Sequence, residues 1–464
     1  MILFNAKIYS DSILREGAIL IKNGKIKKIF IKPSKEKMEE IRKQNENGNE
    51  LDCQKNILIP GIIDIHAHLR DLGQIEKESF SSGTKAAAYS GITTVLNMPN
   101  TNPPAITAER VATWMEKAQN KINVDVGFIG GVPKGINIDE MKKMIKQGVY
   151  GFKIYPLESL NGIDWTQKSN IKILFRRSSQ LQTRIFIHPD WPKTSSEKST
   201  LYSEYITWGW PLLKFHEKLF SVDMEEKYVR FVLDTYEECI RDNNLSKEEY
   251  PIIHFCHISS RKSYKIINET LKSLDHAKIT YEITPHHLLL SNSLKLKNEN
   301  FGKVLPPLRD PEHSEFLFQK YKEGNVMLIG TDHAPHTIEQ KNLDYFDAPS
   351  GFPGFETYPP LLLNKTCTYE LSLETFIKTS VENPAQIFDL QTKGFIKEGF
   401  DADLVLIEKV PEHSIDPKEF HTKAKYSPFD NFKSMVNIKK VYLRGKEINK
   451  EDIHPSGEVL KKIN

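Results

Sequence analysis

One pattern repeats along most of this sequence and limits the folds that it can adopt: a short apolar run rich in β-branched residues, followed by a segment of helical character. Eight such runs occur, at residues 61–68, 91–98, 124–131, 149–155, 184–189, 251–259, 279–285 and 326–332. Strands that alternate with helices are typical of βα units around a parallel sheet. Eight units in succession predict an α/β fold of the (β/α)8 barrel type, which we place at residues 58–389.

Short strand-like segments separated by turns occur at both ends of the chain. Near the N-terminus, Asn23-Gly24 between two apolar runs is a strong signal for a β-hairpin. A charged stretch at residues 32–56 is expected to form a solvated loop or an exposed helix. The simplest packing joins residues 1–57 and 390–464 into one small β-sandwich domain beside the barrel.

The overall composition excludes several classes of partner. The 464 residues include 64 basic and 61 acidic side chains, a net charge of +3, which gives no reason to expect nucleic acid or an anionic membrane surface. The four cysteines have no Cys-x-x-Cys spacing and are typical of reduced thiols in a cytosolic protein. No segment has the apolar length of a signal-peptide core or a membrane span. We therefore expect a soluble, cytoplasmic protein.

Potential metal ligands stand at the carboxyl ends of the expected strands. They are His66 and His68 on the first run, Lys153 on the fourth, His188 on the fifth, His257 on the sixth and Asp332 on the eighth. Barrel enzymes build their active sites at this face. Residues i and i+2 of a strand point to the same side, so His66 and His68 can face one pocket. Since imidazole nitrogens and carboxylate oxygens bind zinc, the sequence predicts a metal site at this end of the barrel.

Several motifs together resemble one known superfamily. They are PGIIDIHAHLRD, GITTVLNMPNTNPP, GFKIY, HFCHIS, TPHHLLLS, PPLRD, GTDHAPHTIEQK and APSGFPGFET. This combination is similar to the amidohydrolase superfamily and, within it, to dihydroorotases of the longer type, over about residues 58–360. The resemblance implies zinc-dependent, reversible cyclisation of N-carbamoyl-L-aspartate to L-dihydroorotate in de novo pyrimidine (UMP) biosynthesis.

The resemblance also implies a role for each candidate site residue. It implies metal ligation by His66, His68, Lys153, His188, His257 and Asp332, and substrate binding by Arg70, Asn100 and His336. Two zinc ions per subunit would be bridged by Lys153 after its conversion to a carbamate, because an ammonium group repels a cation whereas a carbamate offers two anionic oxygens. Asp332 would also act as the catalytic general base and acid. A nearby carboxylate, Asp64, is expected to orient an imidazole.

The identity of the substrate leaves alternatives open. Arg70 favours a substrate that carries a carboxylate, because a guanidinium binds a carboxylate through two parallel hydrogen bonds. Allantoinase and hydantoinase or dihydropyrimidinase are the alternative activities, since these enzymes hydrolyse related cyclic amides. A metal-free scaffold protein of the same superfamily is a further alternative, although such proteins typically lack the ligands that this chain retains.

Three positions depart from the pattern of the resembled family. Leu305 stands where an asparagine is usual, Asp190 replaces the glutamate of a His-x-Glu motif, and Asp71-Leu72 replaces Glu-Pro. None of these changes removes an expected metal ligand. The loops at residues 155–162 and 348–354 are candidate covers for the site.

The segment at residues 189–250 is richer in aromatic residues than a surface helix requires. We expect it to pack against the flank of the barrel, and a lid or a partner surface is the alternative. The resemblance implies a homodimer and an association with aspartate transcarbamoylase, whereas no run of residues identifies either partner. Manganese or cobalt could replace zinc at mixed imidazole and oxygen donors.

Overall fold

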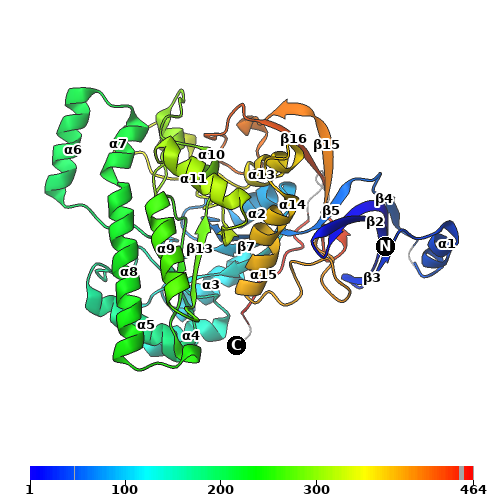
Figure 1. Cartoon of the computed structure of the whole chain (residues 1–464), viewed down its shortest axis with the longest axis horizontal. Helices are drawn as coiled ribbons and strands as arrows, with labels where there is room; N and C mark the ends of the chain where they lie inside the picture. The colour runs from blue at the N-terminus through cyan, green and yellow to red at the C-terminus, as the bar shows by residue number, and fades with distance from the viewer. Residues whose placement is uncertain (46–47, 449–453, 463–464) are drawn as a thin grey trace.

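The computed structural model describes residues 1–45, 48–448 and 454–462. A central barrel of parallel strands is wrapped by helices, and a second sheet built from both ends of the chain lies to one side of it (Figure 1). Helix α6 (Ser195–Trp208) projects at the opposite side of the molecule.

Each of the eight predicted runs contains a strand. The barrel strands are β6 (Ile62–Ala67), β7 (Ile92–Asn97), β8 (Asp125–Phe128), β9 (Gly130–Gly131), β10 (Phe152–Ile154), β11 (Arg184–Ile187), β12 (Ile252–Phe255), β13 (Ile279–Ile283) and β14 (Leu328–Ile329). Neighbouring strands pair in parallel, from β6 to β8 and from β9 to β14. The predicted (β/α)8 barrel is confirmed.

The barrel is continuous although its strands fall into two hydrogen-bonded sheets. The third predicted run divides into β8, which pairs with β7, and β9, which pairs with β10. Between these two strands, the Ile129 amide donates to the Asn97 carbonyl at 3.0 Å. The barrel closes where the His68 amide donates to the His333 carbonyl at 2.8 Å. This closure brings the end of the first barrel strand beside the end of the eighth.

Helices cover the outside of the barrel, and the longer ones bury apolar side chains against it. The longer ones are α2 (Phe80–Tyr89), α3 (Ala108–Ala118), α4 (Ile138–Gln147), α5 (Lys168–Leu181), α8 (Val222–Asp242), α9 (Arg261–Ser273), α11 (Pro311–Lys322) and α13 (Tyr358–Cys367). The shorter ones are α10 (Pro285–Leu289), α12 (Ile338–Lys341), α14 (Leu373–Ile377) and α15 (Asn383–Ile387). In α8, Val229, Val232 and Tyr236 are buried at the spacing of an amphipathic helix. None of the helices in the described part of the chain combines the length and apolar character that crossing a membrane takes.

Both ends of the chain contribute to the second sheet, as the sequence predicts. Its strands are β1 (Ile2–Ser10), β2 (Ile13–Lys22), β3 (Lys25–Ile31), β4 (Glu50–Asp52), β5 (Ile57–Pro60), β15 (Leu404–Ser414), β16 (Lys433–Leu443) and β17 (Lys446–Glu447). β5 pairs with β1 on one side and with β15 on the other, so the C-terminal strands continue the N-terminal sheet. Ile8, Ile19, Leu404 and Tyr442 belong to one apolar core, which the two ends therefore share.

The predicted Asn23-Gly24 hairpin is confirmed. β2 and β3 pair as far as Lys22 and Lys25, and Asn23 and Gly24 between them have φ values of 54° and 76°. A two-residue hairpin loop of this type needs left-handed backbone at both positions, which asparagine and glycine adopt at low cost. The charged stretch that follows contains α1 (Lys35–Lys43), an exposed helix that buries Ile41.

The segment at residues 189–250 forms three helices with different surroundings. α8 packs against α5 and α9, and α7 (Leu212–Leu219) buries Leu213 and His216. α6 buries none of its side chains, and its Ile206 and Trp208 are 63% and 70% exposed. The predicted packing against the barrel flank therefore applies to α8. α6 lies at the edge of the molecule (Figure 1). There Tyr205 stacks on Phe215 of α7, and Tyr202 contacts Phe346 of the loop after α12.

Residues 415–432 leave the second sheet and reach the barrel. The Tyr426 hydroxyl donates to the Gly351 carbonyl at 3.3 Å, and the Thr422 hydroxyl donates to the buried carboxylate of Glu78. This segment therefore supports the loops at the carboxyl ends of the barrel strands from outside.

A buried ion network links the barrel, the second sheet and the C-terminal segment. Asp125, at the start of β8, accepts hydrogen bonds from Lys393 Nζ at 2.6 Å and from Arg444 Nη1 at 2.7 Å. The Glu458 amide also donates to Asp125, at 2.8 Å. Lys393 Nζ also donates to the carboxylate of Asp403, at 2.6 Å. One carboxylate thus joins three segments that are far apart in the chain.

Replacing Asp125 with alanine is expected to lower the free energy of unfolding by about 3 kcal/mol, because the change leaves buried cations without their partner. Urea unfolding followed by circular dichroism would measure the effect. Asp139→Ala is the matched control, since that side chain is 78% exposed on α4. An unfolding midpoint equal to that of the wild type would contradict this role of Asp125.

Candidate metal centre

A cavity of about 370 Å³ lies at the carboxyl ends of the barrel strands. Eight of the nine predicted site residues line it: His66, His68, Arg70, Asn100, His188, His257, Asp332 and His336. The ninth, Lys153, is buried on β10. A larger hollow of about 890 Å³ lies beside the second sheet, but none of these nine residues lines it.

Four histidines form a continuous cluster of imidazole rings. The ring centroid of His66 lies 5.5 Å from that of His68 and 5.1 Å from that of His257. The ring of His188 lies 4.7 Å from that of His257. These residues come from the ends of β6, β11 and β12, and the ends of parallel barrel strands meet at one face. Donors that are far apart in the sequence are therefore neighbours.

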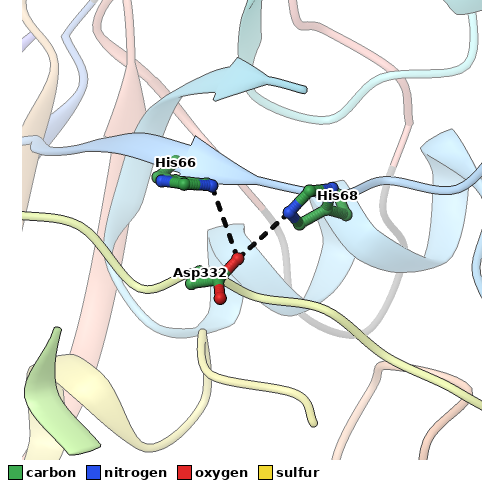
Figure 2. A group of neighbouring side chains, drawn as sticks. All are labelled: His66, His68 and Asp332. Atoms are coloured by element: carbon green, nitrogen blue, oxygen red, sulfur yellow. Dashed lines mark hydrogen bonds and ion pairs between the residues drawn. The ribbon is translucent and has the colours of Figure 1, made fainter. Parts of the chain in front are cut away.

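Asp332 joins this cluster from the loop after β14 (Figure 2). Its Oδ1 lies 3.0 Å from His68 Nε2 and 3.4 Å from His66 Nε2. Burial would raise the pKa of Asp332, but the charge of His66 and a hydrogen bond from His68 hold this pKa below its usual value. The carboxylate is therefore ionised at neutral pH, which is the form that binds metal and accepts protons.

Glu282 on β13 holds the other side of His66. The Nδ1 of His66 donates to Glu282, and His254 Nε2 lies 3.3 Å from the second carboxylate oxygen. Burial opposes a charge on His66, but Glu282 raises the pKa of this imidazole to about 10. A carboxylate behind a histidine fixes the ring so that its other nitrogen faces the metal. Glu282 is not among the predicted residues. Its position as an acidic residue inside an apolar strand could have marked it as a candidate for a functional role.

Cys256 belongs to a second group of potential ligands that the sequence prediction also lacks. One donor atom each from His66, Cys256 and Glu282 lies within 4.8 Å of the others, as is true of His66, His68 and Asp332. Thiolate, imidazole and carboxylate are all ligands of zinc. His66 therefore stands between two groups of donors in the described part of the chain.

Asp64 contacts two backbone amides and a hydroxyl group, and not an imidazole. Its carboxylate accepts from the His66 amide at 3.2 Å and from the Thr331 amide at 2.9 Å, and also from the Thr331 hydroxyl. It thus ties β6 to the segment that carries Asp332. The prediction that Asp64 orients an imidazole directly is wrong, because Glu282 occupies that position.

Lys153 lies at the cluster, and its Nζ lies 5.1 Å from the ring centroid of Tyr155. This Nζ is buried and makes no hydrogen bond to any described residue. Burial is the main cause that lowers the pKa of His257, and the charges of His188 and then Lys153 add to it. Lys153 therefore lies close to the metal donors. Because an unpaired ammonium group is costly to bury, a purely structural role does not account for this lysine.

His188 and His257 point nitrogen atoms at each other. His188 Nδ1 lies 3.2 Å from His257 Nε2, while His188 Nε2 lies 2.8 Å from Asp190 Oδ2. Asp190 therefore reaches the ring despite being shorter than the glutamate that is usual in the resembled family. The arrangement leaves Nδ1 of His188 and Nε2 of His257 facing one point, as two ligands of one metal ion would.

Three site residues have left-handed backbone. The φ values are 55° for Arg70, 35° for His257 and 48° for Asp332. This conformation costs a non-glycine residue roughly 1–2 kcal/mol, and such residues gather at functional sites where the surrounding structure holds them. The short turns after β6, β12 and β14 thus direct these side chains into the cavity.

Arg70, Asn100 and His336 form the side of the cavity next to the metal donors. Asn100 Oδ1 accepts from His68 Nδ1 at 2.6 Å, which leaves His68 Nε2 facing Asp332. Arg70 Nη2 lies 3.3 Å from His336 Nε2, and the buried Nε of Arg70 has no partner among the described residues. A buried guanidinium with unused donors has the chemistry to bind an anion.

Residues of both predicted cover loops also line the cavity. Leu157 and Glu158 belong to the loop after β10, and Pro349 and Ser350 belong to the loop after α12. Leu305 lines the cavity as well, so the wall is apolar where the resembled family usually has an asparagine.

Comparison with known proteins agrees with this geometry. Residues 57–152 and 216–448 match the sequence profile of the Amidohydrolase family. The dihydroorotase of Methanosphaera stadtmanae is 32% identical over 93% of this chain and 92% of its own length. The dihydroorotase of Bacillus cytotoxicus is 31% identical over 89% of this chain and 90% of its own length.

Solved structures share the same fold. L-hydantoinase (dihydropyrimidinase) from Arthrobacter aurescens superimposes with a TM-score of 0.86 at 24% identity, over 99% of both chains. Dihydropyrimidinase from Brevibacillus agri superimposes with a TM-score of 0.83 at 21% identity, over 99% of this chain and 98% of its own.

The barrel and its donor cluster therefore define a metal-dependent hydrolase of cyclic amides. The chain belongs to the amidohydrolase family. The stretch at residues 153–215 lies outside the matched regions and contains Lys153, His188 and α6. The positions of Lys153 and His188 beside the other donors are therefore evidence for the metal site that does not depend on the profile match.

Proposed function

We propose that this chain is a dihydroorotase, which closes N-carbamoyl-L-aspartate to L-dihydroorotate and reopens it in pyrimidine (UMP) biosynthesis. The observation that carries the proposal is the guanidinium of Arg70, which is buried in the same cavity as the metal donors. Both forms of this substrate carry a carboxylate, and a guanidinium pairs with a carboxylate strongly and selectively. The relatives at 31–32% identity that are named dihydroorotase support the same substrate.

The donor set fits a pair of zinc ions. His66, His68 and Asp332 would hold one ion, His188 and His257 would hold the other, and Lys153 would bridge them as a carbamate formed with carbon dioxide. The buried Nζ of Lys153, which makes no hydrogen bond to a described residue, supports this modification, since a carbamate turns a costly cation into an anionic ligand. When bound, the ions supply a polarised amide carbonyl and a water molecule of lowered pKa.

Asp332 is the proton carrier in this proposal. In ring opening, its ionised carboxylate accepts a proton from the attacking water and gives it to the nitrogen of the breaking C–N bond. Arg70 and Asn100 hold the carboxylate of the substrate, and His336 holds the ring beside them. Because these residues line the same cavity as Asp332 and the donor cluster, the amide of a substrate bound in this way would lie beside them.

Counting charges gives the pH dependence of the equilibrium. The open form carries two carboxylates and the ring only one, so closure consumes one proton and releases one water molecule. Acidic conditions therefore favour synthesis of dihydroorotate, and alkaline conditions favour its hydrolysis.

A hydantoinase-like activity is the second candidate, and Leu305 is the observation that favours it. This side chain makes one wall of the cavity apolar, which suits a ureide ring with fewer polar groups than dihydroorotate. Allantoinase is a related alternative, because it also hydrolyses a cyclic ureide. Neither substrate class explains the buried anion site at Arg70 as directly.

Turnover by the zinc-loaded chain would separate these activities. We expect kcat/KM for dihydroorotate to exceed that for hydantoin or allantoin by roughly 10²-fold or more, because a site built to pair a carboxylate penalises substrates without one. Turnover of hydantoin or allantoin alone would overturn the proposal. A chain that binds no zinc after mild purification and turns over none of the three would be a non-catalytic scaffold.

Replacing Arg70 with methionine is expected to keep both metal ions and to raise KM for dihydroorotate roughly 30-fold or more, because the buried charge-assisted pair with the substrate is lost. Steady-state kinetics and metal analysis would measure the two effects. Arg241→Met is the control, since Arg241 is 72% exposed on α8. Wild-type kinetics in Arg70→Met would show that Arg70 is not the carboxylate site.

The remaining expectations concern the location of the protein in the cell, its oligomeric state and its protein partner. We propose a cytoplasmic location, a homodimer and an association with aspartate transcarbamoylase on the strength of the family resemblance alone. Size-exclusion chromatography with light scattering would test the dimer, and co-purification with the transcarbamoylase of the same cell would test the association.

A further inference from the structure

Two buried lysines lie directly behind one wall of the cavity. Lys341, at the end of α12, is 0% exposed, and Lys303 is 6% exposed. Lys341 Nζ donates to the carbonyls of Pro349 at 2.9 Å, Gly351 at 3.0 Å and Lys303 at 3.3 Å. An ammonium group has three N–H donors, so its protonated form matches these three carbonyls.

Lys303 holds the same loop from a second direction. Its Nζ donates to the Tyr345 carbonyl at 2.5 Å and also to the Ala348 carbonyl. In return, the Gly351 amide donates to the Lys303 carbonyl at 2.9 Å. The backbone of residues 345–351, which we call the wall loop, is therefore fixed by two ammonium groups along its whole length.

Burial lowers the pKa of Lys303 to about 8, and the charge of Asp347, in the wall loop, partly opposes this effect. Among the described residues, no carboxylate lies within ion-pair distance of Lys303 or Lys341. Burial lowers the pKa of Lys341 well below its usual value, with Lys303 adding to the effect, whereas the surrounding carbonyls favour the charged form. The two buried lysines are therefore held chiefly by backbone carbonyls and not by close ion pairs.

The cavity side of the wall loop contacts the proposed substrate-binding residues. Pro349, Ser350 and Gly351 line the cavity. The Ser350 carbonyl, which lies between the two loop carbonyls bound to Lys341, accepts from His336 Nε2 at 3.1 Å. A carbonyl can only accept, so it fixes the proton of His336 on Nε2. His336 then offers no acceptor at this atom to Arg70, 3.3 Å away, whose donors remain available to a ligand.

We propose that Lys341 and Lys303 are positioning residues for substrate: they hold the wall loop, through its carbonyls, in a preformed shape. That shape keeps the Ser350 carbonyl on His336 and leaves the donors of Arg70 available to a carboxylate-bearing ligand. The inference rests on the proposed function and deepens it, because the open substrate brings two carboxylates and the ring brings one. Of the two predicted cover loops, the wall loop is thus a rigid part of the site, which leaves residues 155–162 as the cover.

Substitution of Lys341 by methionine separates binding from chemistry. In the zinc-loaded Lys341→Met variant we expect KM for dihydroorotate to rise about 10-fold or more with kcat within about 3-fold of wild type, the signature of lost ground-state binding. Metal content and melting temperature identify variants that fold normally, and Lys303→Met provides a second variant with the same expectation. Lys322→Met, on the exposed face of α11, is the matched control.

A folded, metal-loaded Lys341→Met enzyme with KM within about 2-fold of wild type would overturn the inference. A parallel loss of kcat and metal would also contradict it, since that outcome would mean that the lysines support the metal centre and not the substrate wall. If the wild-type chain does not turn over dihydroorotate, the result rejects the proposed function, and the inference about the wall loop is then decided by the hydrogen exchange of the wild type.

Hydrogen exchange in the wild type tests the same inference without any variant. The amides of residues 345–352, including Gly351, are expected to exchange slowly in the absence of substrate and to change little when dihydroorotate is added. Residues 155–162 are expected to gain protection on addition of dihydroorotate. Rapid exchange of the wall loop that slows only with ligand would show that this loop closes over the substrate and is not preformed.

Discussion

The Lys153→Ala variant is expected to hold at most one tightly bound zinc ion per chain and to lose roughly 10³-fold or more in kcat/KM, because the ligand that bridges the two ions is gone. The barrel itself should fold, since the buried Nζ contributes no hydrogen bond to the structure. Metal analysis after gel filtration and steady-state kinetics with dihydroorotate would measure both losses. In the wild type, ¹³C-labelled carbon dioxide should give a carbamate signal that the variant lacks.

Lys143→Ala is the control for this change, because Lys143 lies on the exposed face of α4 and its side chain is 67% exposed. That variant should keep two metal ions and wild-type kinetics. Two firmly held zinc ions in Lys153→Ala would show that Lys153 is not the bridging ligand.

Asp332→Asn is expected to lower kcat roughly 10³-fold while the chain keeps its fold, because the amide cannot accept and return the proton that a carboxylate carries. Asparagine suits this position, since it tolerates left-handed backbone and Asp332 has φ 48°. Kinetics with dihydroorotate in both directions and metal content would measure the result. The loss should be equal in ring closure and ring opening, because one group serves both directions.

Asp430→Asn provides the matched control, since Asp430 is exposed on the segment outside the barrel. If Asp332→Asn retains wild-type kcat with two metal ions bound, another group must carry the proton. If it loses its metal ions entirely, Asp332 is chiefly a ligand, and the assignment of the proton transfer to it is unsupported.

The metal-donor cluster shows how far local patterns reach. His66 and His68 could be assigned to one face from strand periodicity alone, and Asp332 from its place at the end of the eighth run. Glu282 could not, because nothing in its local sequence indicates that its carboxylate meets His66 across the barrel. The error over Asp64 has the same origin, since proximity in sequence favoured the wrong partner for the imidazole.

Local sequence patterns did not predict the contacts of the loops or of the helices at residues 189–250. The sequence identified residues 348–354 as a candidate cover, but it gave no sign of the carbonyl contacts of Lys303 and Lys341 on which we base the proposal of a rigid wall. The aromatic residues of 189–250 predicted packing, yet α6 buries none of its side chains. Contacts of this kind depend on where distant segments meet, and one-dimensional composition does not specify that.

The sequence by itself determined the alternation of strands and helices, the joining of both ends into one β domain, and the kinds of donor at each strand end. Periodicity and side-chain chemistry are local properties, so they can be read without coordinates. Only the tertiary structure decided which carboxylate supports His66, which carbonyls bind the two buried lysines, and which nitrogen of each histidine faces the cavity. Those choices follow from barrel closure, because hydrogen bonds and charges in a buried site are set by the atoms that folding places within a few ångströms.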